Sequence, residues 1–103
     1  MNLKEGLGVA LRAIRKHKGL SQEDFSDVSG RTYMSALERG IYSPTVDKLD
    51  ELTSVMEVHP VTLLVAAYMK ADPGLSAEEL LVRVLLELEE AGLSKNMDRK
   101  TKA

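Results

Sequence analysis

Apolar residues recur at helical spacing along most of the chain, and no segment shows the alternation typical of a strand. The first periodic run predicts a helix over 3–18. Asn2 and Glu5 form a capping box at its start, and a glycine follows its end. Gly6 and Gly8 weaken this helix, because each costs about 1 kcal/mol relative to alanine in a helix interior.

Two short helices joined by a tight turn are predicted next. Ser21 and the acidic residues after it favour a helix start, so we expect a second helix over about 21–28. The pair Ser29-Gly30 predicts a turn, and a third helix runs over 31–39 up to Gly40. This arrangement is typical of a helix-turn-helix unit.

Three further helices are predicted in the second half of the chain. They cover 46–56, the segment from Pro60 to about 70, and about 77–91. The polar tail at 94–103 is expected to be disordered. The sequence therefore predicts an all-α fold, a five-helix bundle with an additional C-terminal helix.

Composition excludes several classes of protein. A chain of 103 residues favours one domain, and the lack of cysteine excludes disulfide frameworks and thiol catalysis. The two histidines do not have metal-ligand spacing, and there is no nucleophile–base constellation or phosphate-binding glycine loop. We therefore expect no enzyme, cofactor or metal. The longest apolar run, near 61–69, is too short to span a bilayer, so we expect a soluble cytoplasmic protein without a membrane partner.

The charge is distributed unevenly. The formal net charge is −2 overall, but +2 over 1–43, −7 over 44–93 and +3 over 94–103. The distribution of charge governs association with nucleic acid more than the sum does. The first segment is therefore the one expected to face phosphates, and the middle segment is expected to face away from them.

Residues 7–66 resemble the Xre/Cro/cI-type helix-turn-helix regulators of bacteria and phages. The landmarks that carry the resemblance are Leu11, Ile14 and Arg15, then Gly19-Leu20-Ser21-Gln22-Glu23, then Arg31-Thr32-Tyr33, then Leu37-Glu38-Arg39-Gly40, and Ser43-Pro44. The resemblance implies a lambda-repressor-like bundle over 1–70 and a bacterial or phage origin. Between Gln22 and Tyr33 the chain is two residues shorter than the usual family spacing. We therefore expect a shortened second helix, with Val28 or Ser29 at the buried turn position.

The helix at 31–39 is the predicted DNA-recognition element. A major groove admits one α-helix, and the residues at that helix's N-terminal end reach the base edges. The predicted base-contacting residues are Arg31, Thr32, Ser35 and Ala36. The predicted phosphate-contacting residues are Gln22, Tyr33, Arg39, Tyr42, Ser43, Thr45 and Lys48. Alternatives stay open: Arg31 as a solvated helix start, Ala36 as a solvent-facing residue, and Tyr33 at the core edge.

Two other charged groups have structural interpretations. The resemblance implies that Arg15 and Glu38 form an internal salt bridge between the first and third helices. Lys16, His17 and Lys18 are interpreted as a solvated surface, with a phosphate-binding patch as the alternative.

The last helix is more apolar than packing on a small bundle requires. Its seam of Leu81, Val84, Leu85 and Leu88 predicts a homodimer interface at 75–93, because exposed apolar patches mark partner surfaces. The alternative is that this helix only completes the monomer core.

The sequence predicts a DNA-binding transcriptional regulator, a repressor rather than an activator, that binds an inverted repeat as a homodimer. Its expected partners are double-stranded DNA, a second copy and a regulatory protein. A restriction–modification controller or an antitoxin is the alternative within this class. A protein-interaction module that kept the fold without DNA binding is the alternative outside it.

Overall fold

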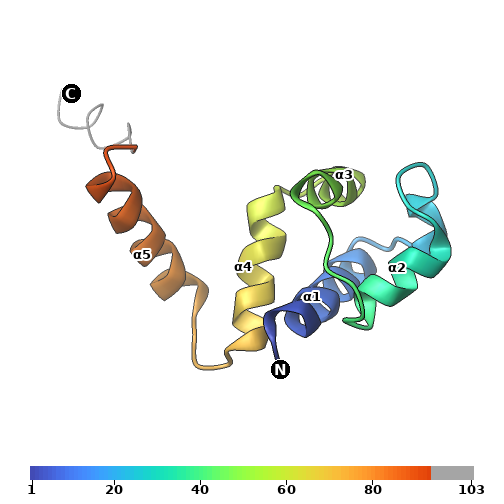
Figure 1. The fold of residues 1–103 in the computed structure, drawn as a ribbon, viewed down its shortest axis with the longest axis horizontal. Coiled ribbons are helices and arrows are strands. Elements are labelled where there is room, and N and C mark those ends of the chain that lie inside the picture. Colours follow the sequence, from blue (N-terminus) through green and yellow to red (C-terminus); the bar gives the residue numbers. More distant parts are fainter. Residues whose placement is uncertain (94–103) are drawn as a thin grey trace.

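The computed structural model describes residues 1–93, and within them it contains helices and no strand (Figure 1). The elements are α1 (Leu3–His17), the 3-10 helix η1 (Gln22–Phe25), α2 (Arg31–Glu38), α3 (Val46–Met56), α4 (Pro60–Ala71) and α5 (Ala77–Glu90). The predicted all-α fold is confirmed. The predicted disorder of 94–103 lies outside the described residues.

The prediction for the second helix is wrong in both the type and the length of the helix. An α-helix over about 21–28 was expected, but only the four residues Gln22–Phe25 are helical, and they form a 3-10 turn. The amides of Val28 and Ser29 both donate to the Phe25 carbonyl, at 2.9 and 2.8 Å, and close the chain into a turn. Ser29 is buried there, so the shortened connection keeps a small buried residue before α2.

The core lies where α1 packs along α4, with η1, α2 and α3 around them (Figure 1). Its buried residues are Ala10, Leu11, Phe25, Met34, Leu37, Leu49, Leu52, Met56, Leu63 and Ala67.

Among the described residues, no single helix has the length and apolar composition needed to cross a membrane. Helices α3 and α4 taken together have that length and composition, but the chain bends by 102° between them.

Gly6 and Gly8 are the points at which α1 touches its neighbours. A Cβ atom on Gly8 would lie 2.5 Å from the Leu37 carbonyl oxygen and 2.6 Å from that of Glu38, both in α2. A Cβ atom on Gly6 would lie 2.6 Å from the Ala67 carbonyl oxygen in α4. The two glycines weaken the isolated helix, but they allow its backbone to contact two other helices directly.

Arg15 and Glu38 form a bidentate ion pair between α1 and α2, in agreement with the resemblance. Arg15 Nε lies 2.6 Å from Glu38 Oε2, and Arg15 Nη2 lies 2.9 Å from Oε1. The two side chains are only 10% and 4% exposed. The hydrogen bond to Glu38 raises the pKa of the Arg15 guanidinium above its ordinary value, against the opposing effect of burial. Arg15 Nη1 also donates to the Leu20 carbonyl at 2.9 Å, which fixes the turn after α1.

Helix α5 stands apart from the bundle (Figure 1). Asp72–Ser76 connects it to α4, the element it contacts most, and none of its residues is buried. The predicted interface residues Leu81, Val84, Leu85 and Leu88 are 45, 39, 55 and 39% exposed. Within the described chain, α5 therefore does little to complete the monomer core, and its apolar side chains remain accessible.

We predict that Glu38→Gln lowers the free energy of unfolding by about 3 kcal/mol or more, because it leaves the buried Arg15 charge unpaired. Urea unfolding followed by circular dichroism measures the change. Glu87→Gln is the matched control, since Glu87 pairs with Arg83 on the exposed surface of α5 at 3.2 Å. The control should change stability by about 0.5 kcal/mol or less. Equal losses in the two variants would contradict the structural role given to the buried pair.

We also predict that Gly8→Ala lowers stability by about 1–3 kcal/mol, because the new methyl group must push α2 away from α1. Helix propensity alone predicts the opposite, a gain of about 1 kcal/mol. The neighbouring exposed substitution Val9→Ala serves as the control and should have an effect of about 0.5 kcal/mol or less. Stabilisation by Gly8→Ala would show that the two helices are not in backbone contact.

Candidate nucleic-acid interface

The N-terminal end of α2 is open to a ligand. Gly30 occupies the N-cap position in an extended conformation and has no side chain that could bond the first-turn amides. Arg31 and Thr32 follow at the exposed start of the helix. Unsatisfied amides and the positive end of the helix dipole favour an anion at such a site, and the arginine adds a full positive charge.

One face of α2 points outward and carries short polar side chains between two arginines. Arg31, Thr32 and Arg39 are exposed and Ser35 is half-buried, and the spacing of 31, 35 and 39 places three of them in one row. Within residues 1–93, no carboxylate forms an ion pair with either arginine. Arg39, a predicted phosphate-contacting residue, lies on the same face as Arg31.

Ala36 is the one predicted base-contacting residue that the structure does not expose. It is 4% exposed, so its methyl group is not available to a thymine methyl. The chain after α2 turns back along this edge of the helix, and the Ile41 amide donates to the Ala36 carbonyl at 2.9 Å. The structure therefore contradicts the alternative of a solvent-facing Ala36, and its burial gives no support to the predicted base contact.

Gln22 connects η1 to the buried ion pair. Its amide nitrogen Nε2 donates to Glu38 Oε1 at 3.1 Å. One hydrogen of the side-chain amide is thereby used inside the protein, and the other remains for a phosphate oxygen. Glu38 thus accepts bonds from two elements that precede α2, Arg15 on α1 and Gln22 on η1.

Lys48 has a mainly structural position. Its ammonium group donates to the Val28 carbonyl in the turn before α2, and it pairs with Glu51 Oε1 at 2.9 Å. These two contacts join α3 to the turn, and the pair with Glu51 partly neutralises the charge of Lys48. The Lys48–Glu51 spacing of three residues was the sequence signal for this pairing.

The segment after α2 presents small polar groups and an aromatic stack. Tyr33 packs against the core and stacks on the exposed ring of Tyr42, with ring centroids 5.8 Å apart and planes inclined by 19°. Ser43 is exposed, whereas the Thr45 hydroxyl accepts the Lys48 amide at 3.0 Å and caps α3. The stack places Tyr42 beside α2, and Tyr33 lies at the core edge. Lys16, His17 and Lys18 are all exposed at the end of α1.

Comparison with known proteins gives consistent results. Residues 11–63 match the model of the helix-turn-helix family. The chain is 38% identical over 66 residues to an uncharacterized HTH-type transcriptional regulator, y4dJ, of Sinorhizobium fredii (strain NBRC 101917 / NGR234). That alignment covers 62% of this chain and 86% of the relative. No solved structure gives a significant match. The family match spans more than half of the chain, including η1, the turn and all of α2, and the chain belongs to the helix-turn-helix family.

Proposed function

We propose that this protein is a sequence-specific DNA-binding transcriptional regulator of the cytoplasm, which represses by occupying an inverted-repeat operator as a homodimer. The observation that carries the proposal is the outward face of α2, which presents Arg31, Thr32, Ser35 and Arg39 on a helix fixed to α1 by a buried ion pair. The regulatory role agrees with the name of the relative in Sinorhizobium fredii.

The side chains on α2 suit base recognition at its N-terminal end. Arg31 has the donor geometry that pairs with guanine O6 and N7 in the major groove. Thr32 and Ser35 are short hydrogen-bonding residues on the same face, and they allow the helix backbone to approach the bases. Ala36 has no place in this set because it is buried.

The surrounding residues suit the phosphate backbone. Arg39 at the end of α2, and Tyr42 and Ser43 after it, are exposed and carry donors that can bond phosphate oxygens. Gln22 retains one donor at the other edge. Three of the predicted phosphate-contacting residues act mainly by positioning other parts of the interface. Tyr33 stacks on Tyr42, Thr45 caps α3, and Lys48 bonds the Val28 carbonyl in the turn before α2.

A homodimer matches the form of the proposed operator. Two recognition helices related by a two-fold axis read half-sites about one helical turn, or about 34–36 Å, apart. The accessible seam of Leu81, Val84, Leu85 and Leu88 on α5 supplies the apolar surface for such a contact. Occupancy of the operator by this dimer then excludes RNA polymerase.

We predict that the wild-type protein selects an inverted repeat from a random pool of duplex DNA. Arg31→Ala should lose the preference at one position in each half-site, with a cost of about 1–3 kcal/mol for that base contact. Arg83→Ala, which removes an exposed arginine on α5, is the control and should select the same sequence as wild type. If the wild type enriches no sequence, the DNA-binding proposal fails, and an interaction module for another protein becomes the better interpretation.

We predict a different effect for Arg39→Ala. Loss of a phosphate contact should weaken binding to all sequences to a similar degree, and it should reduce the slope of log K against log salt concentration by about 1. Fluorescence anisotropy over a series of salt concentrations measures the slope, with Arg83→Ala again as the control. A loss confined to one base position would instead assign Arg39 to base recognition.

A further inference from the structure

A pocket lies at the start of α1, where this helix meets α4 and the chain that follows α2. Leu3 and Leu7 of α1 line one side of it, Leu64 and Ala67 of α4 line another, and the buried Leu49 of α3 also contributes. We call it the α1–α4 pocket. Its volume is about 260 Å³. Because a dry cavity of about 150 Å³ holds a benzene ring, this pocket has room for a small organic molecule.

Two polar side chains complete the lining of the α1–α4 pocket. Lys4 of α1 and Ser43 of the segment after α2 both line it, and both are exposed. A largely apolar lining with a few polar groups is typical of small-molecule sites. An ammonium group and a hydroxyl group can both donate to the oxygen atoms of an anion. The lining therefore suits a molecule with a hydrocarbon body and one negatively charged group.

The charge of Lys4 is not neutralised by another part of the described chain. Within residues 1–93, no carboxylate forms an ion pair with it. Its neighbour Glu5 does not line the pocket, and the Glu5 carboxylate accepts the Asn2 amide at 2.9 Å. Lys4 also lies in the first turn of α1, where the helix dipole opposes a positive charge. A bound anion is therefore favoured by the ammonium group and by the end of the helix.

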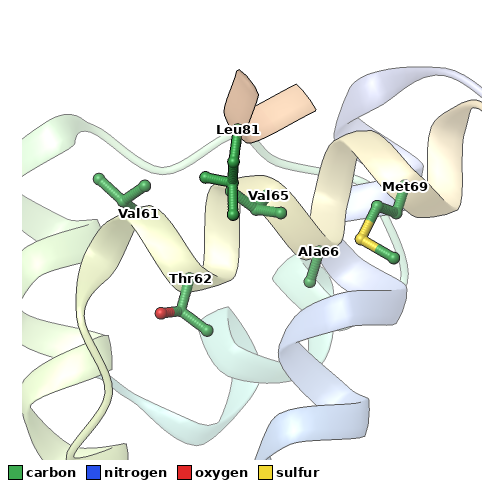
Figure 2. A pocket seen from close by; sticks show the side chains of 6 residues that line it. All are labelled: Val61, Thr62, Val65, Ala66, Met69 and Leu81. Atoms are coloured by element: carbon green, nitrogen blue, oxygen red, sulfur yellow. The ribbon is translucent and has the colours of Figure 1, made fainter. Parts of the chain in front are cut away.

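A second groove, between α4 and α5, has no such groups (Figure 2). Its lining consists of Val61, Thr62, Val65, Ala66, Met69 and Leu81. None of these six residues is charged, so this groove offers no partner for an anion. The charge of Lys4 thus distinguishes the α1–α4 pocket from a merely apolar surface.

The α1–α4 pocket shares Ser43 with the proposed DNA interface. This residue is one of those proposed to bond a phosphate oxygen, and it also lines the pocket. A serine hydroxyl has one hydrogen, so it cannot donate to a bound carboxylate and to a phosphate at the same time. The carboxylate would also place a negative charge beside the phosphate backbone. Occupation of the pocket should therefore oppose DNA binding.

We propose that the α1–α4 pocket binds a small aliphatic carboxylate, and that this ligand lowers the affinity of the protein for DNA. The leucine side chains of the pocket contact the hydrocarbon chain, and the carboxylate pairs with Lys4 and accepts the Ser43 hydroxyl. The regulatory part of this inference rests on the proposed function, whereas the binding part does not. The coupling is reciprocal, so DNA weakens carboxylate binding by the same factor.

Hexanoate is the probe for the binding part, and an NMR titration of the full chain measures its affinity. At millimolar concentration, hexanoate should shift the methyl signals of Leu3, Leu7 and Leu64. Acetate has the charge without the chain, and hexanol has the chain without the charge, so each should bind more weakly than hexanoate.

Two lysine variants test the role of the charge. Lys4→Gln should weaken hexanoate binding about threefold or more, because it removes an ion pair at an exposed position, and it should leave hexanol binding unchanged. Lys16→Gln is the matched control. It removes an exposed lysine in the last turn of α1, outside the pocket, and should bind hexanoate as the wild type does.

Several results would overturn the binding part. Hexanoate that shifts no signal, or only signals away from the pocket, excludes the site. Equal affinities for acetate and hexanoate would show an anion at a surface lysine instead of a ligand in the pocket. Hexanoate binding that Lys4→Gln does not weaken would exclude the pairing of the carboxylate with this residue.

The regulatory part is tested with the duplex that the wild type selects. Saturating hexanoate should raise the Kd for this DNA about fivefold or more, relative to sodium chloride at equal ionic strength. The ratio should be the same for Lys16→Gln and smaller for Lys4→Gln. An unchanged Kd in the wild type would overturn the regulation and leave the ligand site standing. If the wild type binds no DNA, the proposed function fails, and the hexanoate titration alone decides whether the pocket binds a carboxylate.

Discussion

The buried contact between Arg15 and Glu38 is the interaction on which the candidate interface depends. Glu38 is the last residue of α2, where a negative charge is opposed by the negative end of the helix dipole. The bidentate arginine and the Gln22 amide offset this cost, and both come from elements that precede α2. The same arginine also holds the Leu20 carbonyl. One carboxylate therefore joins α1, η1 and α2, and the outward face of α2 takes its direction from that junction.

Backbone contact between α1 and α2 brings the two helices close enough for the Arg15–Glu38 pair to form. Gly8 allows the last turn of α2 to lie directly on α1, which places Glu38 within reach of Arg15 without a long, flexible connection. On the far side, Lys48 joins α3 to the turn that precedes α2. Contacts thus restrain α2 at the turn before it and at its last residue, while its outward face makes no such contact with the bundle. A surface of this kind is preorganised, so little conformational entropy is lost when it binds.

Local sequence signals predicted most of the helical framework, and they failed where tertiary contacts decide. Helical spacing and capping residues set α3 at 46–56 and placed the other α-helices within one or two residues. The burial of Ala36 could not be found in this way, because it depends on the chain at Ile41 turning back along α2. The 3-10 turn at Gln22–Phe25 and the bond from Lys48 to Val28 likewise depend on how the shortened connection closes in space. The sequence did not predict that Gly8 allows α1 to contact α2, for the same reason. Only the positions of the neighbouring carbonyl groups show why a side chain is excluded at this residue.

The brevity of α2 has a consequence for how a regulator of this design finds its site. Eight residues at 1.5 Å each span about 12 Å, which is the length of three to four base pairs. A given sequence of four base pairs occurs by chance about once in every 256 positions, whereas a genome offers about 10⁶ or more competing positions. A single helix of this length therefore contacts too few base pairs to identify one operator. In the proposed homodimer, a second α2 at a fixed distance supplies the missing base contacts, so the rigidity of the connection between the two copies determines which spacing of half-sites is bound.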